Sequence, residues 1–453
     1  MKHFAVLFFL LIASWCAAAE SKPNIVIILA DDLGYGDVGY QGGAAKTPNI
    51  DKLAAEGVQL KAIYGHPMCS PTRAALLTGR YASRWGVTGA QNEQAFPFGT
   101  PTLASILQNA GYETALTGKW HLGSAVETIP NKFGFGYSYG LMAGGATPDT
   151  HEYKFGPHQR TWHRNGEFLD EQGHITDLIT RDAVKWIGGR GDKPFFLYVP
   201  FTAVHVPIAE EKKWLDANPH ISDPAQRLHA ADVTHFDDSV GQIVAALERK
   251  GVRENTLVLF LSDNGAHDNV DNKQDKYPGA DGREALMIKG SNGPLRGFKS
   301  SVYEGGIRTP GVAHWPARWK PRAVDYPLSM TDWLPTLCGI AGATVPAEIK
   351  RDGRDILPLL SGEADKMLLK PRTIYSASAG FRSRAVRDGA WKLIVTTGGK
   401  GGKETRELYN VVEDIGETKN LAAAQPDKVK ELDALLAKLA ADDQPAKAGA
   451  KGD

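Results

Sequence analysis

Acidic and amide side chains follow two apolar segments of the sequence, at the point where each segment ends. The pair Asp31–Asp32 follows Asn24–Leu29, and the pair Asp263–Asn264 follows Thr256–Leu261. Because ligands of open α/β sheets bind outside the carboxyl ends of the strands, we expect the two pairs to meet there. Their oxygens suit a hard cation, Ca²⁺ or Mg²⁺, better than zinc. One such pair alone is more often a turn or helix cap, but two pairs favour a metal site.

Two further apolar segments lead into residues that can transfer protons or bind anions. Glu113–Thr117 is followed by Lys119 and His121, and Pro194–Val199 is followed by His205. Histidine acts as a general acid or base near neutral pH. Either histidine alone is as often structural as catalytic, and a lone lysine is more often a solvated charge. Their common position after buried strands is what makes them candidates.

The four apolar segments are short and continuous, which is typical of strands buried on both faces of a parallel sheet. Helical patterns alternate with them, and each helical pattern ends close to a glycine. The predicted helices are Ile50–Glu56, Thr102–Ala110, Ile175–Ile187 and His229–Lys250. This alternation predicts a layered α/β domain.

Beyond Ala343 the pattern changes. The segments Ser383–Val386 and Trp391–Val395 are predicted to form a hairpin, and Pro426–Ala441 a helix. The predicted organisation is an export signal at residues 1–19, a catalytic domain at 20–345, a small C-terminal α+β domain with an antiparallel sheet at 346–441 and a disordered tail at 442–453. Asp268–Lys289, rich in Asp, Asn and Gly, is expected to be a long surface loop.

The N-terminus has the pattern of an export signal. Lys2 and His3 precede the apolar run Phe4–Ile12, and Ala17–Ala19 offers a cleavage site. The run is too short to span a bilayer, and no later stretch reaches that length, so we expect a periplasmic or secreted protein with no membrane contact after signal removal. Lysine plus arginine equals aspartate plus glutamate at 52 each, which gives no argument for a nucleic-acid partner.

Signal removal leaves two cysteines, Cys69 and Cys338, and hence at most one disulfide. Cys338 lies in the apolar stretch Trp333–Ile340 and is expected to be a buried, inert thiol. Cys69 begins the segment Cys69-Ser70-Pro71-Thr72-Arg73, which is followed by Leu77-Thr78-Gly79-Arg80.

This segment resembles the CxPxR signature of the type I sulfatases. Similar matches run in order from Lys22 to about Leu421, among them Gly118–Gly123, Ser262–Gly265 and Pro294–Lys299. Within that family, Gly134–His151 and Arg296–Arg308 are most similar to the arylsulfatase B (N-acetylgalactosamine-4-sulfatase) branch. The resemblance implies an alkaline-phosphatase-like α/β sandwich with a large, mixed, mostly parallel sheet and a small C-terminal sheet and helix.

The resemblance also implies a nucleophile and a metal site. Cys69 would be oxidised to formylglycine by a maturation enzyme, and a hydroxyl of the aldehyde hydrate would attack sulfur. One cation, Ca²⁺ or alternatively Mg²⁺, would contact residue 69. Its other implied ligands are Asp31, Asp32, Asp263 and Asn264.

Five further residues receive roles from the family pattern. Arg73 would orient the hydrate and the metal ligands. Lys119 and Lys299 would bind sulfate oxygens, His205 with Lys299 would assist the leaving alcohol, and His121 would take the proton that triggers release of sulfate. A further sulfate contact between Gly144 and His151 stays open among Thr147, Thr150 and His151.

The implied substrate is a sulfated saccharide, such as a galactose or N-acetylgalactosamine 4-sulfate, or an aryl sulfate. One alternative is a phosphatase or phosphodiesterase of the same superfamily. Such enzymes usually carry a Ser or Thr nucleophile and a second metal, and the Cys69 segment with two lysines argues against them. The other alternative is an inactive homologue that binds sulfated glycans.

Overall fold

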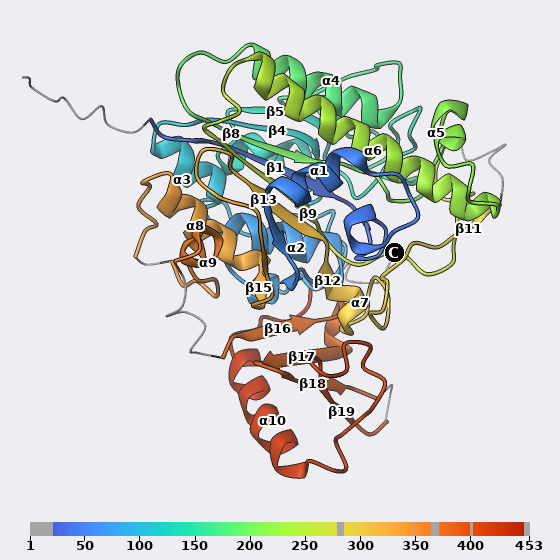
Figure 1. Cartoon of the computed structure of the whole chain (residues 1–453), viewed down its shortest axis with the longest axis vertical. Coiled ribbons are helices and arrows are strands. Elements are labelled where there is room, and N and C mark those ends of the chain that lie inside the picture. The colour runs from blue at the N-terminus through green and yellow to red at the C-terminus, as the bar shows by residue number, and fades with distance from the viewer. Residues whose placement is uncertain (1–20, 279–284, 348, 364–370, 399–401, 448–453) are drawn as a thin grey trace, which may run out of the picture.

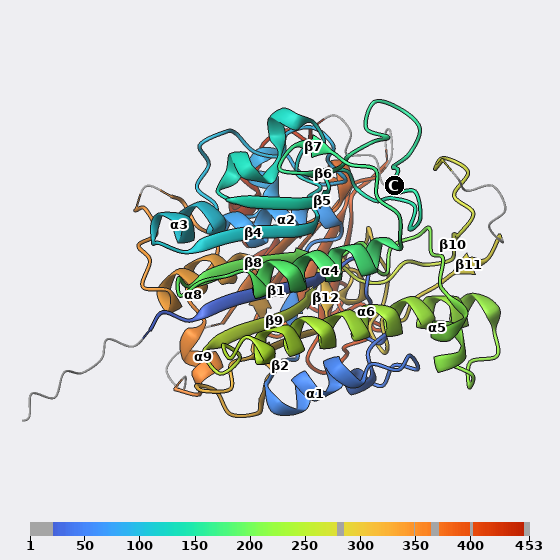
Figure 2. The same cartoon turned by 90° about the horizontal axis from the view of Figure 1, so that it is seen from above.

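The computed structural model describes residues 21–278, 285–347, 349–363, 371–398 and 402–447. A ten-stranded mixed sheet forms its centre (Figures 1 and 2). In spatial order its strands are β14 (Arg322–Val324), β2 (Val58–Leu60), β13 (Gly311–His314), β9 (Thr256–Ser262), β1 (Asn24–Ala30), β8 (Phe195–Pro200), β4 (Glu113–Lys119), β5 (Tyr137–Leu141), β6 (Trp162–Arg164) and β7 (Glu167–Phe168).

The middle of the sheet is parallel. β9, β1, β8, β4 and β5 all run in one direction, and β13 and β6 flank them antiparallel. Nearly every side chain of β1, β4, β8 and β9 is buried, as expected for strands covered on both faces. The predicted α/β sheet and its four parallel strands are confirmed.

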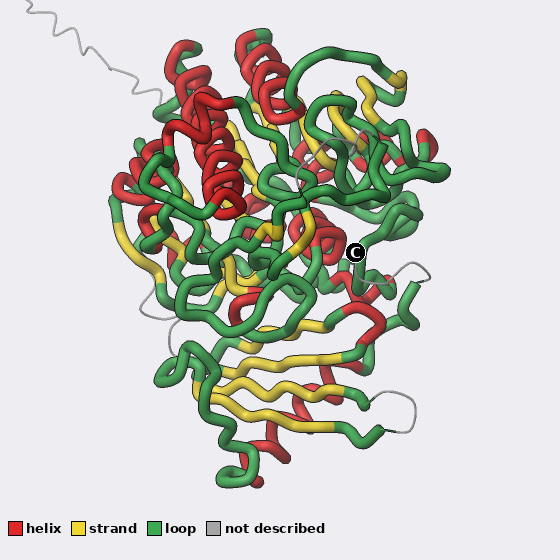
Figure 3. Tube along the Cα trace, turned by 90° about the vertical axis from the view of Figure 1, so that its right-hand side faces the viewer, coloured by secondary structure: helices red, strands yellow, loops and turns green. Residues whose placement is uncertain are grey.

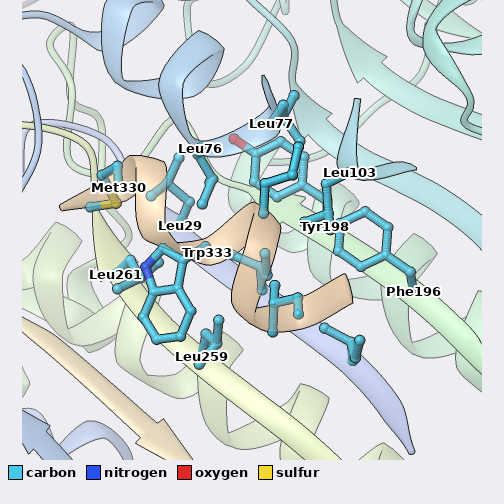
Figure 4. Close-up of a cluster of buried hydrophobic side chains, with 14 of the residues drawn as sticks. Leu29, Leu76, Leu77, Leu103, Phe196, Tyr198, Leu259, Leu261, Met330 and Trp333 are labelled. Carbon is cyan, nitrogen blue, oxygen red and sulfur yellow. The ribbon is translucent and has the colours of Figure 1, made fainter. Parts of the chain in front are cut away.

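Helices cover both faces of this sheet. α1 (Pro48–Glu56), α4 (Ile175–Gly188) and α6 (Pro224–Arg249) pack on one face. The other face carries α2 (Cys69–Thr78), α3 (Leu103–Asn109), α8 (Trp333–Ile340) and α9 (Leu357–Ser361). Leu76, Leu77 and Trp333 belong to the same buried cluster as Leu259 and Leu261 of β9 (Figure 4). This packing fixes the position of α2 relative to the strand ends.

A separate antiparallel sheet of four strands lies beside the large unit, with α10 (Pro426–Ala440) packed on it (Figure 3). Its strands are β16 (Thr373–Ala377), β17 (Ser383–Asp388), β18 (Trp391–Thr396) and β19 (Thr405–Asn410). The remaining short strands and α-helices of the described residues are β3 (Ile63–Tyr64), β10 (Val270–Asp271), β11 (Met287–Ile288), β12 (Arg308–Thr309), β15 (Leu328–Ser329), α5 (Lys212–Ala217) and α7 (Glu304–Ile307). The predicted hairpin corresponds to β17 and β18.

The structure corrects two predicted boundaries. Ile356, Leu359 and Leu360 pack into the core of the large unit, so that unit extends past residue 345. The segment Asp442–Lys447 is not disordered, because Lys447 Nζ donates to two backbone carbonyls at 2.6 and 2.8 Å and further contacts involve Asp443. Polar contacts hold this segment despite its low apolar content.

The predicted export signal and the last residues of the predicted tail fall on residues 1–20 and 448–453, which lie outside the described residues. Among the described residues, no helix is long and apolar enough to cross a membrane.

A buried ion network joins the small sheet to the first residue of α7. Lys392 of β18 is 1% exposed, and its Nζ lies 3.0 Å from Glu304 Oε1 and 2.9 Å from Glu417 Oε1. Burial alone would raise the pKa of Glu304, but Lys392, with two nearby arginines, holds that pKa at about 2. Arg296 Nη1 also donates to Tyr409 Oη at 2.8 Å. The segment between Arg296 and Glu304 is therefore anchored to the small sheet.

A second charged network, centred on a buried histidine, holds the segment that follows β8. His235 of α6 is 2% exposed, and its two ring nitrogens lie 3.0 Å from Glu210 Oε2 and 3.1 Å from Asp177 Oδ1. Burial would lower the pKa of His235, but hydrogen bonds to these two carboxylates raise the pKa to about 9. A charged imidazolium thus connects α4, α6 and the segment that leads into α5.

We predict that Lys392→Met lowers the free energy of unfolding by about 3–5 kcal/mol, because two buried carboxylates lose their partner. Urea denaturation of the full chain measures this change. Lys430→Met on the exposed side of α10 is the control and is expected to change stability by less than about 0.5 kcal/mol. Equal losses in the two variants would contradict the role of the network.

We also predict that the stabilisation contributed by His235 depends on pH. Its folded pKa of about 9 lies above its unfolded value, so the contribution is complete below about pH 6.5 and is lost as pH rises through 9. The difference in unfolding free energy between the wild type and His235→Gln should shrink by roughly 3 kcal/mol over this range. Exposed His220, replaced in His220→Gln, is the control. A constant difference for His235→Gln would rule out the charged form.

Candidate active site

The two predicted acidic pairs meet at the carboxyl ends of β1 and β9. Ala30 and Ser262 are partners in the parallel register, so both pairs leave the sheet at the same level. All four side chains are fully buried, and Asn264 Nδ2 donates to Asp32 Oδ1 at 2.6 Å. Asp32 also has a left-handed backbone, with a φ of 60°, which non-glycine residues adopt rarely and often at functional sites.

Cys69 is the first residue of α2 and points into this acidic site. Pro71 lies in the first helical turn, where a backbone N–H has no partner within the helix to lose. Cys69 Sγ lies 3.1 Å from His121 Nδ1. Burial is the main cause that raises the pKa of the Cys69 thiol to about 12, so the unmodified thiol is protonated and a weak nucleophile at neutral pH.

Arg73 follows Cys69 by four residues and therefore projects from the same face of α2. Its Nη2 lies 2.9 Å from Asp263 Oδ2 and 3.4 Å from Asp31 Oδ2. Its Nη1 donates to the Lys119 carbonyl at 2.9 Å. The guanidinium is fully buried and offsets part of the negative charge of the two strand ends.

Two lysines neutralise the remaining carboxylates. Lys119, the last residue of β4, forms a short ion pair with Asp31. Lys299 Nζ lies 3.0 Å from Asp32 Oδ2. The structure thus gathers both lysines around the acidic pairs, although Lys119 belongs to β4 and Lys299 to the segment before α7.

Two histidines complete the surroundings of Asp32. His205 Nε2 lies 3.6 Å from Asp32 Oδ2, and His267 Nδ1 lies 3.1 Å from the same oxygen. The sequence analysis missed His267, although its position three residues after Asn264 in the same strand-end loop was a usable signal. All ten predicted residues lie in this site, and His267 joins them.

The charges shift the protonation equilibria in opposite directions. Burial and the neighbouring Asp31 raise the pKa of Asp263 to about 7. Burial would also raise the pKa of Asp32, but Lys299, His267 and His205 hold it well below its usual value. Burial, followed by the charges of nearby Lys119 and Arg73, keeps the pKa of His121 well below its ordinary value. His121 is therefore neutral at physiological pH.

The donor set fits a divalent cation. Among the described residues, Asp31 Oδ1 and Asn264 Oδ1 are buried oxygens without a hydrogen-bond partner. Asp31, Cys69 and Asp263 offer ligand atoms that all lie within 4.8 Å of one another. A second cluster with ligand spacing, His174, Glu210 and His235, belongs to the charged network described above, and the ring nitrogens of His235 are already occupied by carboxylates.

Gly144 lies against the imidazole of His121. A Cβ at Gly144 would lie 2.5 Å from His121 Nε2, so no larger residue fits there without displacing the imidazole. The three candidates for a further sulfate contact already have hydrogen-bond partners in the protein. Thr147 and Thr150 share a hydroxyl hydrogen bond, and His151 Nε2 lies 2.8 Å from the Gly173 carbonyl.

Comparison with known proteins agrees with this geometry. Residues 23–343 match the sulfatase family, and residues 297–443 match the C-terminal region of N-sulphoglucosamine sulphohydrolase. N-acetylgalactosamine-6-sulfatase of Mus musculus is 34% identical over 386 residues, which cover 77% of this chain and 68% of the relative. Arylsulfatase G of Rattus norvegicus is 31% identical over 90% of this chain and 84% of its own length.

Among solved structures, Ps i-CgsB in complex with k-i-k-neocarrahexaose superposes with a TM-score of 0.82 at 30% identity and covers 94% of each chain. The similarity therefore includes the small C-terminal sheet as well as the large unit. Taken with the position of Cys69 in a buried acidic site, these matches show that the chain belongs to the type I sulfatase family and is a sulfuric ester hydrolase.

Proposed function

We propose that this protein hydrolyses a sulfate ester of a sulfated saccharide, with formylglycine at position 69 and one divalent cation, Ca²⁺ in preference to Mg²⁺. The observation that carries the proposal is the position of Cys69, whose Sγ lies within 4.8 Å of ligand oxygens of both Asp31 and Asp263. A nucleophile at residue 69 would therefore lie beside these two carboxylates, at the proposed cation site. When bound, the cation supplies Lewis-acid activation at that point.

The residues of the chain itself account for binding of the ester and for proton transfer. Lys119 contacts Asp31 and Lys299 contacts Asp32, so the two lysines are placed to bind the oxygens of an anionic ester. His121 Nδ1, 3.1 Å from the atom at the tip of residue 69, is placed to take a proton from that side chain. Burial lowers the pKa of His205 to about 3, so this histidine acts in its neutral form beside the leaving group.

The relatives support a sulfated saccharide as the substrate class, and the sulfate position is a separate question. We propose a galactose or N-acetylgalactosamine sulfate as the saccharide. The sequence predicts the 4-sulfate, whereas several related proteins are N-acetylgalactosamine-6-sulfatases. Rates of hydrolysis of paired 4-sulfated and 6-sulfated monosaccharides distinguish the two positions directly.

We further propose that the protein is exported to the periplasm or the medium.

We predict an aldehyde at residue 69 in protein produced together with a formylglycine-generating enzyme. Mass spectrometry of the tryptic peptide 62–73 should show a species that reacts with hydrazides, and the protein should hydrolyse an aryl sulfate far faster than the matching aryl phosphate. Cys69→Ala should lose both properties, whereas Cys338→Ala, the control, should keep the aldehyde. An active preparation with only unmodified cysteine at position 69 would contradict the proposal. Faster turnover of the phosphate would favour the phosphatase alternative.

We also predict that Ca²⁺ stabilises the folded protein. After chelation, free Ca²⁺ at 100 times its Kd should raise the free energy of unfolding by about 2.7 kcal/mol, because only the folded state assembles the ligands. Asp263→Asn should remove most of this increase, and Asp427→Asn on the surface of α10 should retain it. A calcium effect of equal size in both variants would place the ion elsewhere.

A further inference from the structure

His267 lies where the loops that follow three neighbouring strands meet. It belongs to the loop after β9, the same loop as Asp263, and is 2% exposed. Asp32 lies in the loop after β1, and Val204 and His205 lie in the loop after β8. Since β1 pairs in parallel with both β8 and β9, the three loops leave the sheet at the same edge. A side chain at this point can therefore fix how the loops lie relative to one another.

The two ring nitrogens of His267 contact two different loops. Nε2 lies 3.2 Å from the Val204 carbonyl oxygen, and Nδ1 lies 3.1 Å from Asp32 Oδ2. Because a carbonyl oxygen only accepts hydrogen bonds, Nε2 carries a hydrogen and donates it to Val204. The imidazole thus connects the loop after β9 to the loop after β8 and lies against the loop after β1.

The contact with Asp32 is one of several that hold this carboxylate. Lys299 Nζ lies 3.0 Å from Asp32 Oδ2, and Asn264 Nδ2 donates to Asp32 Oδ1 at 2.6 Å. Asp32 therefore keeps a cationic partner and a hydrogen-bond donor when His267 is replaced. The contact at Nδ1 is for this reason the less important of the two.

The contact with the Val204 carbonyl acts on the position of His205. Val204 directly precedes His205, and the rings of His205 and His267 meet edge to face with centroids 5.8 Å apart. His205 Nδ1 lies 2.5 Å from the Val206 carbonyl oxygen, so Nε2 is the ring nitrogen left to face the ester. Both histidines line the same cavity of about 460 Å³. His267 therefore supports His205 through the backbone and through the ring.

We propose that His267 is a positioning residue, and that the hydrogen bond from its Nε2 to the Val204 carbonyl holds His205 beside the leaving alcohol. The inference rests on the proposed function, which places His205 there. Without this hydrogen bond, the loop after β8 loses its side-chain connection to the loop that carries Asp263. A displacement of about 1 Å in a group near the reacting atoms lowers a rate about 100-fold, so one such contact is enough to affect turnover.

Two substitutions separate the two contacts of His267. The amide nitrogen of glutamine takes about the position of histidine Nε2, so His267→Gln keeps a donor for the Val204 carbonyl. The shorter amide of asparagine takes about the position of Nδ1, so His267→Asn keeps only the group beside Asp32. For the matured enzyme on a sulfated monosaccharide, we expect kcat to fall about 100-fold in His267→Asn and less than about fivefold in His267→Gln.

The loss should also depend on the leaving group, which a purely structural role would not cause. A nitrophenolate leaves without assistance, whereas a sugar alkoxide does not. His267→Asn should therefore slow hydrolysis of a nitrophenyl sulfate less than about fivefold. In a His205→Ala background, His267→Asn should add little further loss on the saccharide, because the two residues act as a unit.

His314→Gln is the matched control. His314 is a buried histidine of β13 that pairs with Val258, near the start of β9 and away from Asp263. This variant should keep the wild-type rates on both substrates. The increase in unfolding free energy caused by Ca²⁺, measured on every variant, shows whether the protein folds and assembles its metal ligands.

The proposal is overturned by equal losses in His267→Asn and His267→Gln, by full activity in both, or by equal losses on the two substrates. It is also overturned if the losses in His267→Asn and His205→Ala add fully. In each of these cases the sulfatase activity of the wild type stands. If the matured wild type hydrolyses no sulfate ester, the proposed function itself fails, and the role of His267 fails with it.

Discussion

The mutual repulsion of three buried carboxylates is the constraint on which this active site depends. Parallel pairing of β1 with β9 brings Asp31, Asp32 and Asp263 together in a region without solvent. Ionised carboxylates cannot remain there without partners, because burial penalises the charged form. Each is therefore contacted by a cationic side chain, and these contacts fix the geometry around residue 69.

Those cationic side chains come from separate parts of the chain, which explains why so much of the fold contributes to one site. Arg73 is placed by α2, whose apolar side chains pack on the sheet (Figure 4). Lys119 is placed by β4, and Lys299 by the segment anchored to the small sheet. Displacing any one of these elements would leave a carboxylate unpaired in the interior.

The central strands and seven of the ten site residues follow from short-range rules, whereas Cys69, Arg73 and Lys299 were found only through the resemblance to the type I sulfatases. Buried parallel strands are continuous apolar runs, and polar residues that follow them share an edge of the sheet. β2 and β13 were not predicted, since short strands give little periodicity. The start of α6 was placed five residues too late, although Asp223 and Pro224 form an N-cap and first helical residue. The packing of Ile356 and the ordering of Lys447 depend on contacts with residues far away in the sequence. A local sequence pattern cannot predict such contacts.

The link through Lys392 also bears on which part of this chain is a functional unit. The two family matches overlap at residues 297–343, and the overlap includes Lys299. A chain that ended at residue 343 would keep every proposed metal ligand, but Glu304 would lose its contact with Lys392 and Arg296 its contact with Tyr409. Lys119 would stay fixed in the sheet while Lys299 lost its support. Exchange of the small sheet between related enzymes, in evolution or by design, therefore has to carry residues 296–308 along with it.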